Sequence, residues 1–434
     1  MLGLVLASSA GVSLLVNEND SEGWWVASIG LGFLSVFGVS CKVVGIGCGL
    51  EGGWKMFDHL SWMMVELCLI ICGLCMIGAS KVVQYHNFSG FYSCLIVMAA
   101  LFLMLAFSSE SLLWFYWWFE CSLVPVVCMI LGWGSQAERA QAVKYMVLYT
   151  LLGSLPFLGG VIYSYKNLCS WVMWGLHGFI GGVWWLVLLA PFLVKVPLYG
   201  VHSWLPKAHV EAPVEGSMIL AGLTLKLGGY GMIRVLKCFM GSLALVEWVV
   251  IVMAIWGSFV CCLVCLRQMD MKSLVAYSSV CHMGLVVGGV LTSSGWGVGG
   301  SVMMMVGHAF SSSGLFFLVG VIYSVVGSRS LKVCKGVLVL SPSVYMLGFL
   351  LLGAGMSMPP SLNLCGEVLL VGSIVQLSVV WWVLIAVISV LTVGYSLYFF
   401  SVLFHGSPSE MFGSLESVNY SSMLVMGLHV SIVL

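Results

Sequence analysis

Four ionisable side chains stand inside apolar stretches that are otherwise suited to crossing a membrane. They are Glu120 in "WWFECSLVP", Lys195 in "APFLVKVPLYG", Lys226 in "LAGLTLKLGGYG" and Glu367 in "NLCGEVLLV". An ionised residue near the centre of a bilayer costs about 2.5–3.5 kcal/mol on insertion scales. Unpaired, the four would cost about 10–14 kcal/mol, which is comparable to the whole stability of a typical protein. We therefore expect them to pair, to contact water, or both.

Each of these charges also has a simpler explanation. A long side chain can carry its charged end to the membrane surface, or the charge can lie at a helix end. Glu367 follows the string "SMPPSLN", so it can be a carboxylate at a helix start, where the helix dipole stabilises an anion. These alternatives stay open for all four residues at this level.

Four histidines occur in similar polar surroundings. His202 and His209 follow Lys195 at steps of seven residues, which is about two helical turns. His282 in "AYSSVCHMG" and His308 in "MMMVGHAFSSSG" lie beside serines in separate later apolar runs. A single histidine in a membrane is more often a packing residue, but four beside polar neighbours favour a hydrated path. Histidine titrates near neutral pH, and a lysine beside a changing charge can switch between holding and releasing a proton. The pattern predicts proton translocation.

Prolines interrupt the apolar pattern in two places. Pro197 and Pro206 fall in "KVPLYGVHSWLPKAHVEAP", and Pro359 and Pro360 fall in "SMPPSLN". Proline removes a helical hydrogen bond, and in lipid the freed carbonyl needs a partner from protein or from a water-filled cavity. Matched interruptions in two halves of a chain indicate inverted repeats with an ion path near the middle of the membrane. Pro359 lies 162 residues after Pro197, which is consistent with a duplication.

The elements that must hold these residues are membrane-spanning helices. The chain has 434 residues, of which 61% are hydrophobic and only 7% are charged, whereas soluble domains carry about 25% charged residues. Apolar runs of roughly 17–25 residues recur from end to end, each long enough to cross ~30 Å of hydrocarbon. We count about fourteen such runs, with no soluble domain left over. The sequence predicts an all-α integral membrane protein with about fourteen transmembrane helices.

The composition argues against several other functions. The net charge is zero, without a basic tail, so no nucleic-acid partner is expected. The sixteen cysteines include two CxxC matches, Cys72–Cys75 and Cys262–Cys265, but both lie in apolar runs without a second pair or a nearby histidine. Such thiols behave as small hydrophobes, so we expect no metal site. The GxGxxG match "GCGLEG" lacks a strand–turn–helix context and predicts no bound nucleotide.

Residue usage and loop charge bear on the location of the protein. There are 26 Met, 18 Trp, 22 Phe and 52 Gly but only ten Pro, which favours codons rich in G and T and suggests a strand-biased organellar genome. With about fourteen spans, the odd-numbered loops hold nine Lys and Arg residues and the even-numbered loops hold five. The positive-inside rule then places both termini on the outer face of the membrane.

Six strings resemble the antiporter-like proton-translocating subunits of respiratory complex I (NADH:ubiquinone oxidoreductase), a family that also includes subunits of multisubunit cation/proton antiporters. The strings are "FECSLVP", "WGSQAERAQAVKYMVLYTLLGSLP", "KVPLYGVHSWLPKAHVEAPVEGSM", "LKLGGYGMIR", "DMKSLVAYSSVCHMG" and "NLCGE", and they occur in family order. The resemblance implies two inverted five-helix repeats among fourteen helices, with the seventh and twelfth helices broken. It divides the chain into N-terminal helices (1–90), a first repeat (91–237), a second, inverted repeat (246–405) and a C-terminal helix (406–434).

The same resemblance implies roles for individual residues. Glu120 matches a glutamate on the fifth helix that pairs with a lysine on the seventh, here Lys195. Lys226 matches the central lysine of the eighth helix. Glu367 matches an acid on the twelfth, where the sister chains 2 and 5 usually carry lysine. The connecting histidines of the family match three residues: His202, His282 and His308.

The resemblance implies a redox-coupled proton-pumping module of the mitochondrial inner membrane. The outer face, on which the loop charges place both termini, would then be the intermembrane-space side. No cofactor is expected in this chain, because NADH, FMN, iron–sulfur clusters and ubiquinone belong to partner subunits in the family. Expected partners are other membrane-arm subunits, including the sister chains 2 and 5, and lipids such as cardiolipin. Separation of Glu120 from Lys195 would move Lys195 towards Lys226, and the proton of Lys226 would pass to Glu367.

Two other functions and two residues remain open. A subunit of a secondary cation/proton antiporter shares the charged track but would work without NADH oxidation and respond to sodium, and a structural membrane scaffold is the third possibility. Glu215 stands where the family has a small residue; it is either an extra acid at the proton entrance or, as we favour, a helix-start residue. Glu66 matches no role in the family.

Overall fold

The computed structural model describes residues 30, 58–79, 88–168, 171, 173, 183–238, 244–407 and 420–434. The apolar runs expected near residues 8 and 33, the "GCGLEG" string and much of the expected N-terminal unit 1–90 lie outside the described residues. In the described part of the chain, all regular secondary-structure elements are helices. An isolated antiparallel β-bridge joins Asp270 to Ser330.

The described helices run along the chain from residue 59 to residue 433. In chain order they are α3 (His59–Gly78), α5 (Ser89–Phe107), α6 (Leu112–Cys121), α7 (Leu123–Trp133), α8 (Arg139–Leu168), α9 (Val183–Lys195), α10 (Trp204–Glu211), α11 (Val214–Ile219), the π-helical turn η2 (Leu220–Thr224), α12 (Leu225–Cys238), α13 (Ala244–Cys265), α14 (Met271–Leu291), α15 (Gly295–Val326), α16 (Val337–Leu340), α17 (Pro342–Gly355), α18 (Leu362–Leu377), α19 (Trp381–Phe404) and α20 (Tyr420–Val433).

Many of these helices have the length and composition of membrane spans. Nine helical segments among the described residues have at least 18 residues and an apolar 18-residue window, and four apolar helices are shorter. Helices α6 and α7 together form one such span, and so do α11, η2 and α12 up to Leu236. The prediction of an all-helical, multi-span membrane protein is confirmed. The count of fourteen stays a prediction, because part of the chain lies outside the described residues.

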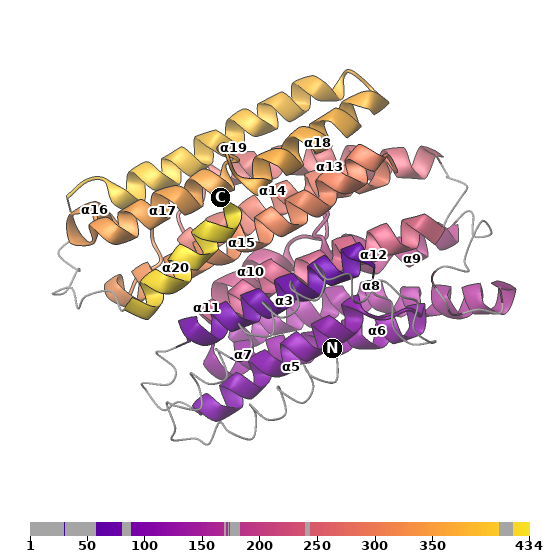
Figure 1. Ribbon diagram of the computed structural model, residues 1–434, viewed down its shortest axis with the longest axis horizontal. Helices are drawn as coiled ribbons and strands as arrows, with labels where there is room; N and C mark the ends of the chain where they lie inside the picture. The colour runs from indigo at the N-terminus through magenta and orange to yellow at the C-terminus, as the bar shows by residue number, and fades with distance from the viewer. Residues whose placement is uncertain are drawn as a thin grey trace.

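Helix α15 lies in the middle of the bundle (Figure 1). It packs against α14, α17, α18 and α20, and it also contacts α11 and η2. Helices α13, α14, α18 and α19 form one side of the molecule in Figure 1, and α3 and α5–α9 form the other. Helix α12 packs against α9, α14 and α15. The chain segments around Lys195, Lys226, His282 and His308 are thereby brought to the interior.

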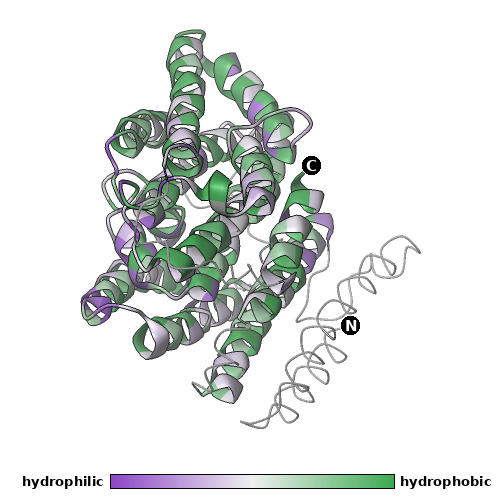
Figure 2. Cartoon of the chain, turned by 90° about the vertical axis from the view of Figure 1, so that its left-hand side faces the viewer, coloured by the Kyte–Doolittle hydropathy of each residue, from purple (hydrophilic) through white to green (hydrophobic). Residues whose placement is uncertain are grey.

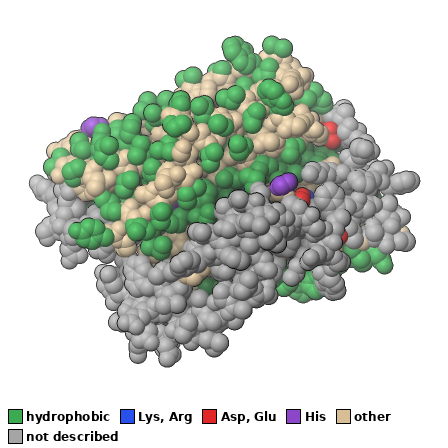
Figure 3. Space-filling view, in the orientation of Figure 1, with side chains coloured by type: hydrophobic (Ala, Val, Ile, Leu, Met, Phe, Trp, Pro, Cys, Tyr) green, Lys and Arg blue, Asp and Glu red, His purple; other side chains and the backbone are tan. Residues whose placement is uncertain are grey.

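Burial differs strongly between the helices. The most apolar window of Val214–Leu236 is 94% buried, whereas that of α19 (Trp381–Phe404) is only 33% buried. The exposed side chains of α19 are themselves apolar, as Trp382, Val383 and Val390 illustrate. Green, hydrophobic residues predominate along the described helices in Figure 2, and green side chains are spread over the described part of the face in Figure 3. Any charge on the buried α12 must therefore be satisfied by protein groups.

Two breaks interrupt the helical pattern. Helix α9 ends at Lys195 and α10 begins at Trp204, with Pro197 between them. Helix α17 ends at Gly355 and α18 begins at Leu362, with Pro359 and Pro360 between them. Both breaks therefore coincide with prolines, which cannot donate a helical hydrogen bond.

Pro206 has a different position from the other three prolines. It is the third residue of α10. In the first turn of a helix the backbone N–H has no intrahelical partner, so proline removes no hydrogen bond there. The interruption after Lys195 thus depends on Pro197 and the following turn, and Pro206 belongs to the helix that comes next.

Candidate functional site

Lys226 lies in the first turn of α12, directly after the π-helical turn η2. Its side chain is fully buried. The ammonium group donates a hydrogen bond of 2.6 Å to the carbonyl of Ala221, which lies within η2. A π-helical turn shifts the backbone hydrogen-bonding pattern by one residue, and such turns often occur at functional sites. Here the irregular turn supplies a carbonyl to a lysine whose side chain is fully buried.

The second partner of Lys226 is a histidine on another helix. The Nζ atom of Lys226 lies 3.0 Å from Nδ1 of His308, on α15. Because an ammonium group only donates, His308 accepts this hydrogen bond on Nδ1, which assigns its own proton to Nε2. His308 is 2% exposed. The lysine and the histidine therefore form a buried donor–acceptor pair between α12 and α15.

Two further titratable groups continue from His308. The ring of His282, on α14, has its centroid 5.6 Å from that of His308. The Nδ1 atom of His282 lies 3.5 Å from Oε1 of Glu367, on α18. This distance is within ion-pair range but longer than a good hydrogen bond. The four residues thus form a sequence of neighbours, Lys226, His308, His282 and Glu367, contributed by four different helices.

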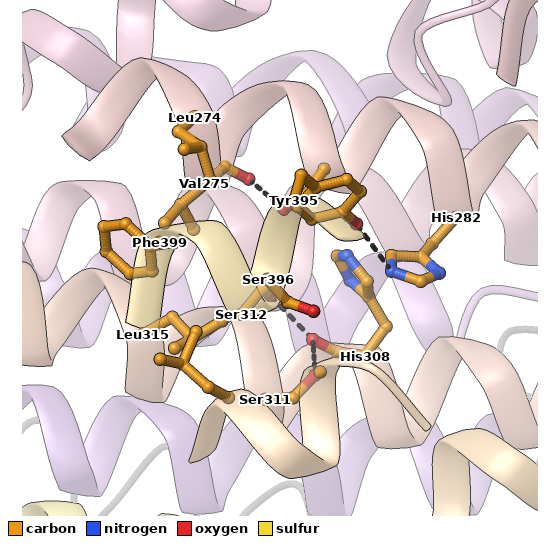
Figure 4. A pocket seen from close by; sticks show the side chains of 13 residues that line it. Leu274, Val275, His282, His308, Ser311, Ser312, Leu315, Tyr395, Ser396 and Phe399 are labelled. Carbon is orange, nitrogen blue, oxygen red and sulfur yellow. Dashed lines mark hydrogen bonds between the residues drawn. The ribbon is translucent and has the colours of Figure 1, made fainter. Parts of the chain in front are cut away.

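A small cavity adjoins the two histidines (Figure 4). Its volume is about 30 Å³, which is room for about two water molecules. The hydroxyl group of Tyr395 points from α19 to Nε2 of His282 at 3.5 Å. Ser311 and Ser312 line the cavity, and both donate to the carbonyl of His308, so their oxygens remain acceptors. The cavity can hold water in contact with both imidazole rings.

Lys195 and Glu120 form the second group of charges. Lys195 is 2% exposed, and its ammonium lies 3.5 Å from the centre of the Phe119 ring and 3.3 Å from the carbonyl of Phe119. Among the ion pairs of the described residues, none joins Lys195 to Glu120, although the Glu120 charge acts on the lysine. One carboxylate oxygen of Glu120 is buried without a hydrogen bond. The expected direct pair is thus replaced by a cation–π contact with the preceding residue.

His209 and His202 lie on the chain that follows the first break. His209 is fully buried and stacks on Phe316 with ring centroids 4.5 Å apart. Neither ring nitrogen has a hydrogen bond, and the charges of Lys226 and Lys272 act on the ring. His202 instead stacks on Tyr199, with ring centroids 4.9 Å apart, and accepts a hydrogen bond from Gly200 N. His209 therefore packs against α15, whereas His202 contacts its own loop and Tyr277 of α14.

The two acids that the resemblance left without a role are both buried. Glu215 lies in the first turn of α11, as expected for a helix-start residue, and accepts a 2.8 Å hydrogen bond from the hydroxyl of Tyr92. Glu66 lies inside α3 and is 8% exposed. The Tyr92 contact ties α11 to α5, so Glu215 has a structural partner in addition to its place at the helix start.

Several polar residues at the site were not singled out by the sequence. Asn363 donates to Ser311 at 3.1 Å and to the carbonyl of Ala354 at 2.8 Å, so it joins the second break to α15 and α17. Lys272 is 4% exposed and donates to the carbonyl of Ala212 at 2.8 Å. The position of Asn363, three residues after Pro360, is a signal that could have identified it. Tyr395 stands in an apolar helix without any such signal.

A metal site in a protein needs several His, Cys, Asp or Glu side chains that lie close together. No group of three or more His, Cys, Asp and Glu side chains among the described residues is arranged to hold a metal. The thiols of Cys262 and Cys281 contact each other at 2.9 Å in the apolar space between α13 and α14. The titratable side chains that meet at the site are a lysine, two histidines and a carboxylate, all of which can exchange protons.

Comparison with known proteins identifies the family. The family model described as "NADH:quinone oxidoreductase/Mrp antiporter, TM" matches residues 109–392. NADH-ubiquinone oxidoreductase chain 4 of Ceratitis capitata is 43% identical over 377 residues, which cover 86% of this chain and 84% of that protein. The chain belongs to this family. Chain 4 of Mytilus edulis is 40% identical over 418 residues, which cover 95% of this chain and 93% of that one. The resemblance inferred from the six strings is confirmed.

Solved structures share the fold at much lower sequence identity. A chain of respiratory complex I from Thermus thermophilus superposes with a TM-score of 0.88 at 22% identity, covering 99% of this chain and 94% of that one. A chain of the Mrp complex from Dietzia sp. gives a TM-score of 0.88 at 17% identity, covering 100% of this chain and 92% of that one. At such low identity the likeness shows the fold alone, which is that of an antiporter-like membrane subunit.

Proposed function

We propose that this chain moves protons within the membrane arm of NADH:ubiquinone oxidoreductase, and that Lys226, His308, His282 and Glu367 carry them. The observation that supports the route most is the buried sequence of contacts, 3.0 Å from Lys226 to His308 and 3.5 Å from His282 to Glu367. A structural scaffold would have no need for four titratable groups on four interior helices, since each costs about 2.5–3.5 kcal/mol near the membrane centre.

The transfer begins at the Lys226–His308 pair. The ammonium of Lys226 gives a proton to Nδ1 of His308, and the proton on Nε2 of His308 leaves towards His282, directly or through water in the adjoining cavity. Imidazole suits this step because it accepts a proton on one nitrogen while releasing one from the other. His282 then delivers its proton to the carboxylate of Glu367. After the transfer Lys226 is neutral and must be reloaded.

The charge that drives the transfer is supplied by Lys195. When Lys195 leaves Glu120 and approaches α12, its positive charge disfavours the proton on Lys226. Two unit charges 4 Å apart interact by about 4 kcal/mol at an effective dielectric of ~20, and about 1.4 kcal/mol is tenfold in an equilibrium. The movement of one lysine is therefore large enough to reverse the proton equilibrium. The structure holds Lys195 on the Phe119 ring, away from a direct ion pair with Glu120.

Helices α9 and α12 are close enough for this coupling. A Cβ atom on Gly228 would lie 2.6 Å from Cγ2 of Val196 and 3.1 Å from Cβ of Lys195. A side chain at position 228 would force Val196 to shift, so glycine allows this close approach of the two segments. Because Gly228 follows Lys226 by two residues, a shift at the end of α9 acts directly on the turn that carries Lys226.

The larger architecture of the proposal follows the family. We propose two inverted repeats, 91–237 and 246–405, each with one broken helix, flanked by the units 1–90 and 406–434. The two breaks that follow α9 and α17 support this division. The protein would reside in the mitochondrial inner membrane with both termini towards the intermembrane space. The partners would be membrane-arm subunits such as chains 2 and 5, together with cardiolipin, and other subunits would hold NADH, FMN, iron–sulfur clusters and ubiquinone.

The decisive variant is Lys226→Met, introduced into the whole oxidoreductase and studied in proteoliposomes. We expect the number of protons pumped per NADH oxidised to fall by the share of this subunit, while NADH oxidation in the presence of an uncoupler persists. Lys332→Met, at an exposed loop position, is the matched control. Unchanged pumping by the Lys226 variant would reject the route.

A secondary cation/proton antiporter is the alternative that the fold supports, because the Mrp chain superposes equally well. Such an activity would persist without NADH and would depend on a sodium gradient. Proton uptake that follows sodium in the absence of NADH, and that is lost in Lys226→Met, would favour this second function.

A further inference from the structure

The loops at one end of the molecule are joined to each other by backbone hydrogen bonds. Asp270, which precedes α14, forms an antiparallel β-bridge with Ser330, which follows α15. Met271 N donates to the carbonyl of Arg329 at 3.1 Å, and Leu331 N donates to that of Met269 at 2.8 Å. These bonds fix the start of α14 against the chain that leaves α15, so that Lys272 and Arg329 face the same neighbour.

That neighbour is the carbonyl end of the short helix α10. Arg329 donates to the carbonyl of Val210 at 2.8 Å. Lys272 donates to the carbonyl of Ala212 at 2.8 Å and has a longer contact of 3.5 Å with that of Val210. The last carbonyls of a helix have no intrahelical partner, and the negative end of the helix dipole attracts cations. Two cations from distant parts of the chain thus replace the missing bonds of α10.

The contacts are buried and carry their own counter-charge. Lys272 is 4% exposed, and the side chain of Arg329 is 13% exposed. The carboxylate of Glu211, the last residue of α10, lies 4.0 Å from the guanidinium of Arg329. Hydrogen bonds from charged donors are stronger than neutral ones, and their loss in a buried place is costly.

The helix held in this way carries His209. Val210 directly follows His209 in the chain. A hydrogen bond to the carbonyl of Val210 therefore fixes the backbone one residue after His209. The His209 ring is nearly parallel to Phe316, at 4° between ring planes, and makes no hydrogen bond that would orient it. Its placement against Phe316, on the helix α15 that also carries His308, therefore depends on the position of the α10 backbone.

We propose that Lys272 and Arg329 are positioning residues, which clamp the carbonyl end of α10 and so hold His209 against α15, the helix that carries His308. This inference rests on the proposed proton route and adds a link between the first break and the helices α14 and α15. The hydrogen bonds of both cations go to the carbonyls of Val210 and Ala212, so the clamp acts through α10.

The test compares variants of the whole oxidoreductase in proteoliposomes. The readouts are protons pumped per NADH oxidised, NADH oxidation with an uncoupler, and the amount of assembled complex on a native gel. The variants are Lys272→Gln, Lys272→Arg, Arg329→Gln, His209→Phe and the double variant Lys272→Gln/His209→Phe. Phenylalanine at position 209 preserves the stack on Phe316 but removes the titratable ring. Lys335→Gln is the control, because this lysine is exposed near the same loop.

We expect Lys272→Gln to lower the proton yield per NADH by as much as His209→Phe does, and the double variant to show no further loss. Lys272→Arg, which keeps a charged donor, should restore most of the yield. Arg329→Gln should lower it less, because Lys272 still holds the carbonyl of Ala212. If Lys272→Gln fails to assemble, Arg329→Gln decides the question alone.

Several results would overturn the clamp. The first is a normal proton yield per NADH in His209→Phe. The second is a double variant whose proton yield is lower than that of either single variant. The third is a Lys272→Gln complex in which the rates of pumping and of NADH oxidation fall together, so that the proton yield per NADH is unchanged. The failure of the proton route itself is separate. Normal pumping by Lys226→Met would reject the route. If Lys226→Met loses proton pumping but Lys272→Gln and Arg329→Gln both have a normal proton yield, only the clamp is rejected.

Discussion

The break after Lys195 and the break before Glu367 hold charges of opposite sign in different ways. Lys195 is the last residue of α9, where the helix dipole favours a cation. Its ammonium contacts an aromatic ring and a carbonyl, neither of which can take a proton at neutral pH. Glu367 lies beyond the first turn of α18, so the dipole helps it less, and its nearest charged partner is the titratable ring of His282.

This difference suggests a division of labour between the two breaks. A cation held by a ring and a helix end can move without exchanging a proton, because none of its contacts is an acid or a base. A carboxylate beside a histidine can exchange a proton without moving. We infer that the first break supplies a moving charge and the second break supplies a proton acceptor.

The largest effect is expected at the second break. Glu367→Gln keeps the shape of the side chain but removes the base that receives the proton from His282. The proton yield per NADH should fall by the whole share of this subunit, as for Lys226→Met, while uncoupled NADH oxidation persists. Glu138→Gln, an exposed acid away from the route, is the control. Normal pumping by the Glu367 variant would remove the distinction between the breaks.

Glycine substitutions compare the packing at the two breaks. A Cβ atom on Gly366 would lie 2.8 Å from the backbone nitrogen of Met304, which cannot move aside. On Gly228 its closest contact would be a methyl group of Val196 at 2.6 Å, which has some freedom to turn. Overpacking costs about 1–3 kcal/mol, and we expect Gly366→Ala near the upper end.

Thermal unfolding and the amount of assembled complex provide the measurement for this pair. Gly366→Ala should lower both more than Gly228→Ala does. Gly299→Ala should change neither, because no atom lies within 4 Å of a Cβ placed there. Equal losses for the two variants, or a larger loss for Gly228→Ala, would contradict the difference in packing.

A smaller effect is expected from the ring beneath Lys195. Phe119→Leu removes a cation–π contact that typically contributes about 0.5–2 kcal/mol, so Lys195 should pair more often with Glu120. Coupled NADH oxidation should slow by a few fold while the proton yield per NADH stays unchanged. Phe115→Leu removes a neighbouring ring that does not contact the ammonium and serves as the control. A faster coupled rate would indicate that the ring hinders Lys195.

The smallest effect on pumping is expected far from both breaks. Asp58, the N-cap of α3, pairs with Arg234 near the end of α12. Burial acts to raise the pKa of Asp58, but the hydrogen bonds and charge of Arg234, with hydrogen bonds from Ser61, lower it to about 2. A carboxylate with a lowered pKa stabilises the fold above its usual value of 3.8 and loses that effect as the pH falls towards 2. Asp58→Asn should lower the melting temperature at pH 7 and leave the proton yield unchanged.

The melting experiment also has a pH dependence that checks the pair. Between pH 5 and pH 8 the contribution of Asp58 should be constant, because this range lies above both pKa values. The melting temperatures of the Asp58→Asn variant and of the natural protein should therefore differ by a constant amount in this range. A difference that disappears by pH 5 would show that the carboxylate is not held in its charged form.

Much of the fold could be predicted from the sequence because the membrane restricts the possible structures. Apolar runs of helical length leave little choice of element, and the prolines beside Lys195 and before Glu367 indicated where helices stop. The family resemblance, confirmed by the relatives, identified Lys226 and Glu367 as residues of interest. Their roles in proton transfer stay a prediction.

Other features depend on packing that no sequence pattern encodes. The π-helical turn before Lys226 and the place of Lys195 on the Phe119 ring arise from contacts between helices far apart in the chain. The contact of Lys272 likewise could not be predicted, because the carbonyl that it binds belongs to a residue 60 positions away in the chain. A periodic pattern shows which side of a helix is apolar, but it does not show which neighbour receives a polar group.

The proposed proton transfer from His308 to Glu367 passes through His282. Its most direct test is the proton yield per NADH of a His282→Phe variant. Phenylalanine keeps a flat ring between His308 and Glu367 but cannot carry a proton. With the exposed His405→Phe as control, we predict that the assembled His282→Phe complex oxidises NADH with an uncoupler and loses the pumping share of this subunit. A yield equal to that of the natural complex would contradict the route.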